Sequence, residues 1–428
     1  MCISATNGKT TLTAMLAKMC QGASLTLAHN MAGANLRSGI ATTLLTTRRD
    51  VDVSLLETDE AALPSVAVDV QPDVVVLANL FRDQLDRYGE LEVLAERWRL
   101  MLDELDPATT IVYNADDPLI AELVDAHVQR ARTAGEPVRT LSFGIDDPSV
   151  AAPTLPHAAD SKFCRRCHTP LTYERSFVGH LGLYRCGNCG FERPEPDVRA
   201  TRVKLNGLAA SDIEIVTPGG VVEARLRIPG LYNVYNAVAA TAAAHALGLG
   251  TETIGGGIDG FSPAFGRFER IPIPNAGTLT LLLVKNPTGL NEVVRTLIDA
   301  KVDLRATLFA LNDGIADGRD TSWIWDADLE PLFGSAPSMV VTGDRAAEFA
   351  LRAIYGGMDA ERIHLDEDLE AAMYELLDRA RTFAQGHAYA LVTYTAMLAM
   401  RRIITERGWV SAYWQGSAPE LEKEGIVP

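Results

Sequence analysis

The hydrophobic residues in the first half of the chain fall into short apolar runs that alternate with longer helical patterns. Apolar runs predict strands at 53–56, within 73–80 and at 110–113. Helical spacing predicts helices over 90–105 and 118–134. Strands that are apolar on both faces are typical of a parallel sheet, because helices cover both of its sides. The pattern therefore predicts an α/β domain.

The second half repeats this alternation after a short break. Alternating residues over 221–228 predict an antiparallel return, and the alanine-rich run 233–247 predicts a closely packed helix. Two prolines and a glycine within 271–277 mark an expected domain boundary. Further strands are expected at 279–284, 306–311, 339–342 and 388–393.

These patterns predict two domains. We expect the first over residues 1–270 and a second, Rossmann-like α/β domain over 271–428. The second domain has no glycine-rich fingerprint of a dinucleotide-binding site, so a bound dinucleotide need not be inferred. The residues from Gly416 onward are expected to form a poorly ordered tail.

The segment Thr6-Asn7-Gly8-Lys9-Thr10-Thr11 opens the first helical run, 12–19. At a helix start, backbone N–H groups beside a glycine can cradle phosphate, lysine neutralises charge, and a threonine hydroxyl can reach Mg²⁺. We interpret it as a nucleotide-phosphate loop. The alternative is a polar turn before a helix.

The loop departs from the usual pattern in two ways. Ile3 takes the place of the first glycine of the long form, and Ala5 takes that of the leading glycine of the shorter form. Only residues 1–3 precede the loop, whereas a phosphate loop normally follows a full strand. We therefore expect that the start is truncated or that the first strand is missing.

Carboxylates gather where the predicted strands end. Glu57 ends one strand in the segment LLETDE, and the segment 79–89 follows another. Ligands of open α/β sheets bind beyond the carboxyl ends of the strands, so Glu57 is a candidate Mg²⁺ ligand. A solvated acidic turn is the alternative for Glu57, and an acidic helix start is the alternative for Asp83 and Asp86. The segment 113–118 is interpreted as a turn with an aspartate cap before Pro118.

Composition and charge narrow the class of protein. The 428 residues, 47% hydrophobic, allow about two or three domains. With 39 basic and 56 acidic residues, the net charge of −17 argues against a general nucleic-acid or membrane-surface binder. We find no secretory signal and no run of about 20 apolar residues that could span a bilayer. We expect a cytoplasmic protein without a transmembrane segment.

An insertion over residues 160–193 carries four of the six cysteines as two C-x-x-C pairs, Cys164 with Cys167 and Cys186 with Cys189. Two such pairs bring four thiolates to tetrahedral distance around Zn²⁺ and leave no open position, which predicts a structural zinc site. A redox C-x-x-C pair is the alternative. We expect His168 and His180 to be surface residues, and Cys2 and Cys20 to be ordinary thiols.

Two polar loops are expected in the second half, each after a predicted strand. The first is 285–292, and the second, 312–326, contains four acids, one arginine and two tryptophans. Such a composition is poorly explained by solubility alone, because functional residues concentrate on loops.

The sequence resembles the Mur ligase family, because five of its segments follow that family's order. They are TNGKTT (6–11), NLFRDQLDRYG (79–89), NADDP (114–118), GLYNVYNA (230–237) and FGRFE (265–269). The resemblance implies a central P-loop ATPase domain of the Mur ligase type with an inserted four-cysteine zinc ribbon, followed by a Rossmann-like C-terminal domain. It also implies that ATP activates a carboxylate as an acyl phosphate, which a nitrogen nucleophile then attacks.

The resemblance further implies roles for single residues. Lys9 would contact the β- and γ-phosphates, Thr10 and Glu57 would hold Mg²⁺, and Asn233 and Arg267 would line the nucleotide site. From the residues alone, a surface ion pair with Glu269 is the plainer interpretation of Arg267.

The zinc ribbon and the two polar loops narrow the resemblance to the MurT branch, the Mur-ligase-like subunits of lipid II isoglutaminyl synthases. In that branch the acceptor is the α-carboxyl of D-glutamate in the lipid II stem peptide, and the nucleophile is ammonia. This chain shows no evident Cys-His arrangement for hydrolysing glutamine. The resemblance therefore implies a GatD-like glutaminase partner, docked on the C-terminal domain, and work at the inner membrane face where lipid II resides. We hypothesise that acids of the 313–326 loop, such as Asp317, or Glu348 face that partner or the ammonia path.

Two other classes stay open. A conventional Mur or folylpolyglutamate-type ligase would add an amino acid instead of ammonia, but is not expected to carry a zinc ribbon. The second alternative class is a non-catalytic scaffold protein, whose altered loop would no longer bind ATP.

Overall fold

The computed structural model describes residues 1–30, 34–83, 91–157, 159–262, 267–383 and 386–410. The chain forms two compact units. Unit 1 comprises Met1–Ala264, Asn286–Lys301 and Trp325–Asp328, and unit 2 comprises the intervening segments and the remainder up to Pro428. The domain boundary expected near residue 271 stays a prediction. The expected tail from Gly416 lies outside the described residues.

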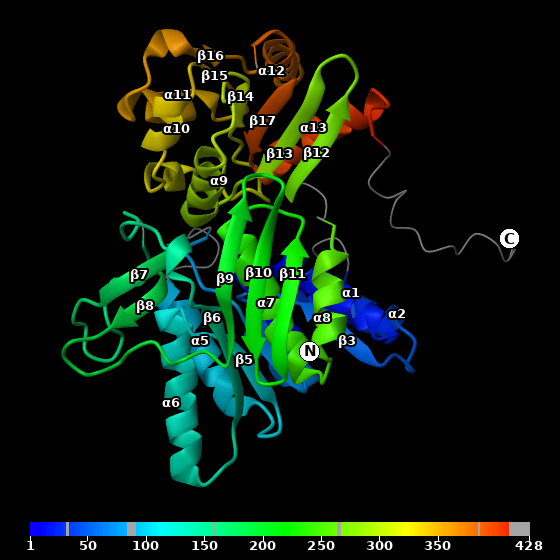
Figure 1. The fold of residues 1–428 in the computed structure, drawn as a ribbon, viewed down its shortest axis with the longest axis vertical. Helices are drawn as coiled ribbons and strands as arrows, with labels where there is room; N and C mark the ends of the chain where they lie inside the picture. Colours follow the sequence, from blue (N-terminus) through cyan, green and yellow to red (C-terminus); the bar gives the residue numbers. More distant parts are fainter. Residues whose placement is uncertain (31–33, 84–90, 158, 263–266, 384–385, 411–428) are drawn as a thin grey trace, which may run out of the picture. The chain divides into compact units, whose positions relative to one another are not determined.

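Unit 1 is built on a sheet that has nine strands within the described part of the chain (Figure 1). Its strands are β1 (Cys2–Ser4), β2 (Leu27–His29), β3 (Val53–Glu57), β4 (Val74–Leu77), β5 (Thr110–Asn114), β6 (Arg139–Ile145), β9 (Val198–Asn206), β10 (Ala210–Thr217) and β11 (Gly220–Leu226). Their order is β11-β10-β9-β6-β5-β4-β1-β3-β2, and all neighbours are parallel except β9-β10 and β10-β11. The apolar runs therefore form a central parallel sheet, and the alternating segment forms its antiparallel edge.

The expectation that the first strand is missing is wrong. β1 lies between β4 and β3 in the middle of the sheet, where Cys2 pairs with Val75 and Leu56. Three residues form a strand here because both neighbours supply backbone partners and because helices cover both faces. Cys2 and Ile3 are fully buried as a result.

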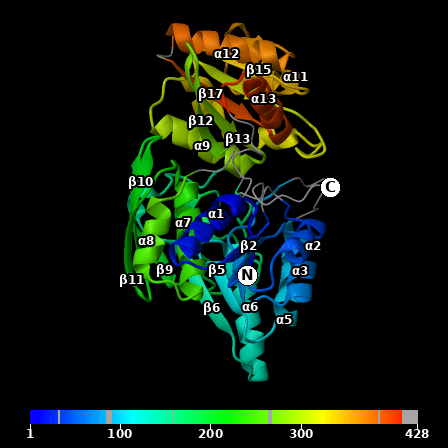
Figure 2. The ribbon, with the colours of Figure 1, turned by 90° about the vertical axis from the view of Figure 1, so that its right-hand side faces the viewer.

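Helices cover both faces of this sheet (Figure 2). The helices of unit 1 are α1 (Lys9–Gly22), α2 (Arg37–Thr46), α3 (Leu63–Val70), α5 (Leu91–Glu104), α6 (Pro118–Ala134), α7 (Leu231–Ala246), α8 (Thr251–Asp259) and α9 (Pro287–Asp299), with a short 3-10 helix at Pro148–Val150. One apolar core contains α1, α7 and α8, and another contains α3, α5 and α6. Small side chains of α7, such as Ala240 and Ala243, are fully buried, which agrees with the predicted close packing.

The insertion forms an antiparallel hairpin of β7 (Thr172–Val178) and β8 (Leu181–Arg185). Tyr184 of β8 packs with Phe191, Cys164 and Cys186 in a small separate core.

Unit 2 contains a six-stranded sheet in the described residues. Its strands are β12 (Arg267–Ile273), β13 (Gly277–Leu283), β14 (Thr307–Ala310), β15 (Met339–Thr342), β16 (Ile363–Leu365) and β17 (His387–Val392), in the order β12-β13-β17-β14-β15-β16. β12 is antiparallel to β13, and the other neighbours are parallel. The helices are α10 (Glu330–Ser335), α11 (Ala346–Tyr355), α12 (Leu369–Phe383) and α13 (Tyr394–Glu406), with 3-10 turns at Ser322–Trp325 and Ala360–Arg362.

The prediction of a loop over 285–292 is wrong for residues 287–292, which are helical. Asn286 caps a helix, and α9 begins at Pro287 and belongs to unit 1. Proline is favoured at the first helical position after such a cap, because its missing N–H would have no helical partner there.

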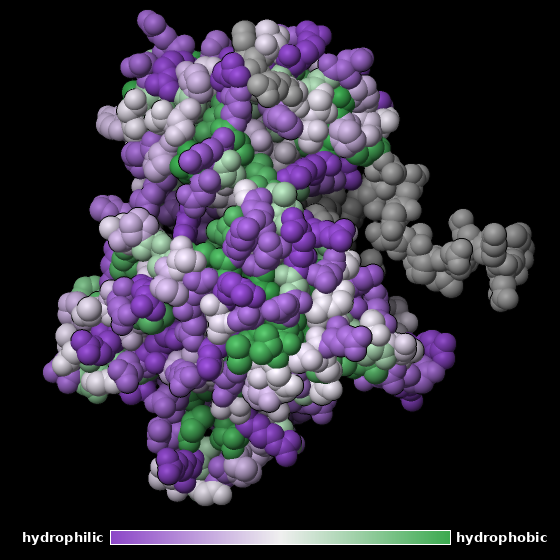
Figure 3. Space-filling model, in the orientation of Figure 1, coloured by the Kyte–Doolittle hydropathy of each residue, from purple (hydrophilic) through white to green (hydrophobic). Residues whose placement is uncertain are grey.

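In the described part of the chain, every helix is too short or too polar to cross a membrane. The face drawn in Figure 3 is mainly hydrophilic, and its hydrophobic residues form small separate patches.

Candidate nucleotide-phosphate site

The segment between β1 and α1 forms a tight loop at the carboxyl edge of the sheet. Gly8 caps α1 with a φ of 90°, and its carbonyl accepts the first helical hydrogen bond from the N–H of Leu12 at 2.9 Å. A Cβ on Gly8 would lie 2.0 Å from Oδ1 of Asn236. Both the conformation and the close approach of α7 therefore require glycine at this position.

Lys9 is the first residue of α1, and its ammonium group is buried. Nζ lies 2.7 Å from Oε2 of Glu60 and also donates to the carbonyl of Ala5. Glu60 is itself fixed, because its carbonyl accepts from the indole N–H of Trp98 at 2.8 Å. The expected phosphate-binding lysine is thus held at the loop by a carboxylate whose role the sequence did not reveal.

Thr10 and Glu57 are brought together as the sequence suggested. The hydroxyl of Thr10 donates to Oε1 of Glu57 at 3.0 Å. Glu57 ends β3 and is buried, and its backbone N–H and C=O both bond the side chain of Asn30. Two oxygens that share one octahedral Mg²⁺ at about 2.05 Å lie about 2.9 Å apart. The observed separation fits such a pair of ligands.

Asparagine side chains surround the loop from other elements. Asn79, after β4, accepts from the N–H of Asn7 and donates to its carbonyl, both at 2.9 Å. The amides of Asn7 and Asn286 bond each other at 2.9 and 3.2 Å. Thr6 joins the same support, because its hydroxyl accepts from the N–H of Phe81 at 3.0 Å. The loop is therefore fixed by two segments that are distant in the sequence, the one after β4 and the start of α9.

The start of α7 lies beside the loop. Asn233 is buried and donates to the carbonyl of Pro229 at 2.7 Å, while its Oδ1 accepts from Asn236 at 3.2 Å. Asn233 thus orients Asn236, the residue that contacts Gly8. Thr11, the last residue of the expected loop, is buried in the first turn of α1.

Arg267 begins β12, and its side chain lies outside the described part. Glu269 pairs instead with Arg401, whose Nη2 lies 3.1 Å from its carboxylate. The family segments 79–89 and 265–269 lie partly outside the described residues.

The turn before α6 behaves as predicted at Asp117, which caps the helix by accepting from the N–H groups of Leu119 and Ile120. Its neighbour Asp116 is fully buried and bonds Arg193 at 2.5 Å and the hydroxyl of Tyr235 at 2.6 Å. Burial raises the pKa of Asp116, although Arg193 and Tyr235 oppose that rise. Asp116 thereby connects the insertion to α7, a role that sequence reasoning missed.

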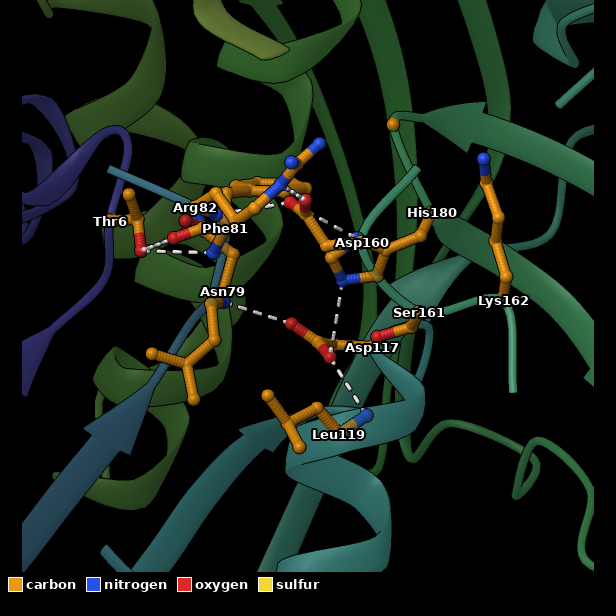
Figure 4. Close-up of polar contacts among 12 residues, drawn as sticks. Thr6, Asn79, Phe81, Arg82, Asp117, Leu119, Asp160, Ser161, Lys162 and His180 are labelled. Atoms are coloured by element: carbon orange, nitrogen blue, oxygen red, sulfur yellow. Dashed lines mark hydrogen bonds and ion pairs between the residues drawn. The ribbon is translucent and has the colours of Figure 1, made fainter. Parts of the chain in front are cut away.

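The expectation that His180 is a surface residue is wrong. His180 lies in the turn between β7 and β8, is fully buried, and packs against Phe81 with ring centroids 4.8 Å apart (Figure 4). Its Nε2 lies 3.4 Å from Oδ1 of Asp117, and its Nδ1 lies 4.0 Å from Oδ2 of Asp160. The buried imidazole is paired with both carboxylates, because a buried charged group needs a counter-charge. His168 is exposed, as expected.

Asp160 extends this cluster toward the loop. It accepts from the backbone N–H of Arg82 at 3.0 Å and also bonds the Arg82 guanidinium (Figure 4). Arg82 directly follows Phe81, which bonds Thr6. The insertion is therefore attached to the phosphate-loop edge by a continuous polar cluster.

The four cysteines of the insertion converge. Their Sγ atoms all lie within 4.8 Å of one another, with Cys164 and Cys189 at 3.6 Å and Cys167 and Cys186 at 3.4 Å. Four thiolates at about 2.3 Å from one tetrahedral Zn²⁺ lie about 3.8 Å apart. The cluster can therefore hold a metal ion. Cys2 and Cys20 are buried elsewhere, as expected of ordinary thiols.

The two candidate acids of unit 2 are both engaged. Asp317 is buried and accepts from the backbone N–H of Thr395 at 2.8 Å and from its hydroxyl. Glu348 accepts from the hydroxyl of Thr321 at 2.5 Å and from Arg345 at 2.9 Å. Their proposed relation to a partner stays a prediction.

Comparison with known proteins places this geometry in a family. Residues 3–172 match the model of the Mur ligase middle domain, and residues 283–397 match that of the MurT ligase C-terminal region. The chain is 34% identical to the MurT subunit of lipid II isoglutaminyl synthase (glutamine-hydrolyzing) of Streptococcus pneumoniae, over 95% of this chain and 87% of that protein. The chain belongs to the MurT family.

A second MurT relative, from Staphylococcus aureus strain COL, is 28% identical over 93% of this chain and 85% of its own length. Among solved structures, a pseudomurein peptide ligase type C from Methanothermus fervidus shares the fold. Its TM-score is 0.71 at 21% identity, over 95% of this chain and 78% of that chain. The α/β Mur ligase fold implied by the five sequence segments is confirmed.

Proposed function

We propose that this protein amidates the α-carboxyl of D-glutamate in the lipid II stem peptide to D-isoglutamine, at the expense of ATP. The proposal rests on the 34% identity to a MurT subunit over 95% of the chain. The γ-phosphoryl group of ATP passes to the carboxyl, ammonia attacks the acyl phosphate, and inorganic phosphate leaves. Catalysis of such a reaction needs positioning and charge neutralisation more than covalent help.

The loop 6–11 supplies the phosphate cradle in this proposal. Gly8 brings the backbone close to the phosphates, while Thr6 and Asn7 hold the loop through their bonds to Phe81 and Asn79. Lys9 exchanges Glu60 for the β- and γ-phosphates when ATP binds. Supporting this role, α1 has no acidic residue in its first turn and, within the described part, no side-chain cap, so its start favours an anion.

Thr10 and Glu57 are the proposed Mg²⁺ ligands, supported by their 3.0 Å separation at the end of β3. A bound Mg²⁺ supplies charge neutralisation on the phosphate oxygens. The two residues orient the ion: Asn30 fixes the backbone of Glu57, and α1 fixes Thr10. Asn233 is proposed to line the nucleotide site through Asn236, and Arg267 is proposed to contact the nucleotide.

Cys164, Cys167, Cys186 and Cys189 are proposed to form a zinc ribbon with a structural Zn²⁺. Four thiolates saturate the ion, so it takes no part in the reaction. Its effect is on folding, because it fixes the insertion that carries His180 and Asp160 to the loop edge.

A GatD-like glutaminase is proposed to supply the ammonia by forming a heterodimer with this chain. The Streptococcus pneumoniae relative is named as a subunit of a glutamine-hydrolyzing enzyme, which supports this proposal. Asp317 and Glu348 are proposed to lie toward that partner or the ammonia path. The complex is proposed to be cytoplasmic and to work at the inner membrane face.

The deciding experiment is mass spectrometry of lipid II incubated with the full chain, ATP and Mg²⁺, with ammonium chloride or with glutamine and the partner. Conversion of one carboxyl to an amide supports the proposal. Addition of an amino acid instead would identify a conventional Mur or folylpolyglutamate-type ligase. Failure to bind ATP would identify a scaffold.

The roles of Asp317 and Glu348 need a separate comparison. We expect Asp317→Asn or Glu348→Gln to reduce amidation with glutamine and the partner while leaving amidation with ammonium chloride intact. Glu406→Gln, at a 61% exposed side chain of the same unit and outside that loop, is the matched control. Unchanged glutamine-dependent activity in both variants would remove these two acids from the partner site.

A further inference from the structure

A small pocket in unit 1 lies between the start of α7 and the middle of α9. Gly207, Gly230 and Leu231 line it on one side, and Glu292, Arg295 and Thr296 of α9 line it on the other. The hydroxyl of Thr296 faces Gly230, since a Cβ on that glycine would lie 3.0 Å from Oγ1. Oxygens of Glu292 and Thr296 therefore line the pocket where α9 packs against the start of α7.

Glu292 is the unusual residue of this pocket. It is only 6% exposed, and its described interactions are a hydrogen bond that its backbone carbonyl accepts from the hydroxyl of Thr296 at 2.7 Å and an ion pair of its carboxylate with Arg295. The nearest opposite charge is Nη1 of Arg295, 4.0 Å from Oε1. That guanidinium is turned away, because it donates to the carbonyls of Phe177 at 2.6 Å and Val150 at 2.8 Å. A buried carboxylate whose described counter-charge lies 4.0 Å away is costly, so a hydrogen-bond donor that enters the pocket would be stabilised.

The charges around Glu292 favour a cation as that donor. On α9, Asp299 lies 3.5 Å from Nε of Arg295, so two carboxylates face one guanidinium. On α7, the buried Tyr235 feels the charge of Glu292. Burial raises the pKa of Glu292 to about 7, against the opposing effect of Arg295, so its charge changes near neutral pH. The few oxygens of the pocket suit a cation that donates directional hydrogen bonds better than K⁺, which is of nearly the same size but prefers a fuller shell of oxygens.

The pocket is also close to the phosphate loop within unit 1. Asn286, the cap of α9, bonds Asn7, and Glu292 follows it by six residues, or about 9 Å along the helix. On α7, Asn236 contacts Gly8 a short distance after Gly230. Both helices that form the pocket therefore reach the loop.

We propose that this pocket binds an ammonium ion through the carboxylate of Glu292. The role of this pocket rests on the proposed function, because ammonia is the nucleophile of the proposed amidation. The pocket would hold that nitrogen donor close to the loop. Binding itself can be measured without any reaction.

The first test is a titration of the full chain with ¹⁵N-ammonium chloride, with binding followed from the linewidth of the ammonium signal at constant ionic strength. We expect saturable broadening that Glu292→Gln weakens at least about tenfold, as loss of a charge-assisted hydrogen bond requires. Glu223→Gln, at a 73% exposed side chain of the same unit, is the control and should behave like the wild type. Equal competition by potassium chloride, tighter competition by methylammonium, or no saturable broadening would each overturn the proposal.

A second measurement needs no variant and keeps the proposal testable if Glu292→Gln fails to fold. Binding of ammonium to the wild type should weaken as pH falls below about 7, because Glu292 takes up a proton and loses its charge. Binding that stays constant from pH 8 to pH 5.5 would contradict a role for Glu292.

The kinetic test separates this proposal from the proposed function. In amidation driven by ammonium chloride, Glu292→Gln should raise KM for ammonium about tenfold and leave KM for ATP unchanged. An unchanged KM for ammonium would overturn the pocket's role. If the wild type amidates nothing while ammonium still binds, the proposed function fails and the binding site stands.

Discussion

The ammonium group of Lys9 lies 2.7 Å from the carboxylate of Glu60, and both side chains are buried. In this structure the lysine expected to bind phosphate is paired with a residue 51 positions later in the chain. Glu60 thus keeps the charge of Lys9 at the loop.

We expect Glu60→Gln to lower the free energy of unfolding by about 3 kcal/mol, because removal of one partner leaves a buried charge without its counter-charge. Urea denaturation monitored by circular dichroism measures this change. Asp50→Asn removes an ion pair of Arg48 that is exposed and serves as the control without a measurable effect. Equal stability of Glu60→Gln and wild type would show that Lys9 does not depend on Glu60.

Lys9→Ala should abolish detectable ATP binding while the chain stays folded, because the loop loses its only described side-chain cation. Isothermal titration calorimetry with a non-hydrolysable ATP analogue measures this. Lys18→Ala, further along α1, is the matched control. Retained affinity in Lys9→Ala would remove the loop from the nucleotide site.

Gly8→Ala should weaken ATP binding at least about tenfold, because the new Cβ would lie 2.0 Å from Oδ1 of Asn236 and displace it. Gly135→Ala is a matched control. That glycine also has a positive φ, 75°, but a Cβ there meets nothing within 4 Å. Both variants carry the conformational cost of about 1 kcal/mol, so only the contact with Asn236 distinguishes them. If both bind ATP equally, that contact is unimportant.

His180 should make stability depend on pH. Burial alone lowers the pKa of His180, but the charge of Asp117, assisted by Asp160, outweighs it and raises the pKa above 6.5. A raised histidine pKa gives a stabilising contribution that is complete below about pH 6.5 and is lost as pH rises through the folded value. The stability difference between wild type and His180→Gln should therefore shrink from pH 6 to pH 9.

Urea denaturation at a series of pH values measures this difference. His168→Gln, at an exposed position of the same insertion, should parallel the wild type at every pH. A difference between wild type and His180→Gln that grows with pH would show that His180 is neutral in the folded protein.

Removal of metal should destabilise the insertion. We expect about one zinc per chain by inductively coupled plasma mass spectrometry, and loss of that zinc with a lower Tm in Cys164→Ser. Cys20→Ala, at a buried cysteine of α1, should keep the metal. A metal-free wild type with the same Tm before and after treatment with a chelator would exclude a structural metal.

Local patterns determined the parts of the structure that act within a few residues. Helix α6 occupies the predicted 118–134 with Asp117 as its cap, and β15 occupies the predicted 339–342. The spacing of the four cysteines likewise led to the observed cluster. Periodicity, caps and C-x-x-C spacing act between near neighbours, and therefore can be read from the sequence alone.

Only the tertiary structure decided which distant residues meet. The order of the strands places β1 in the middle of the sheet and brings Asn7 to Asn286, 279 positions away, and Asp116 to Tyr235, 119 positions away. It also buries His180 between two carboxylates and leaves Glu292 facing a pocket. A buried charge or amide is satisfied by whichever group the fold brings near it, and no local signal in the sequence identifies that group.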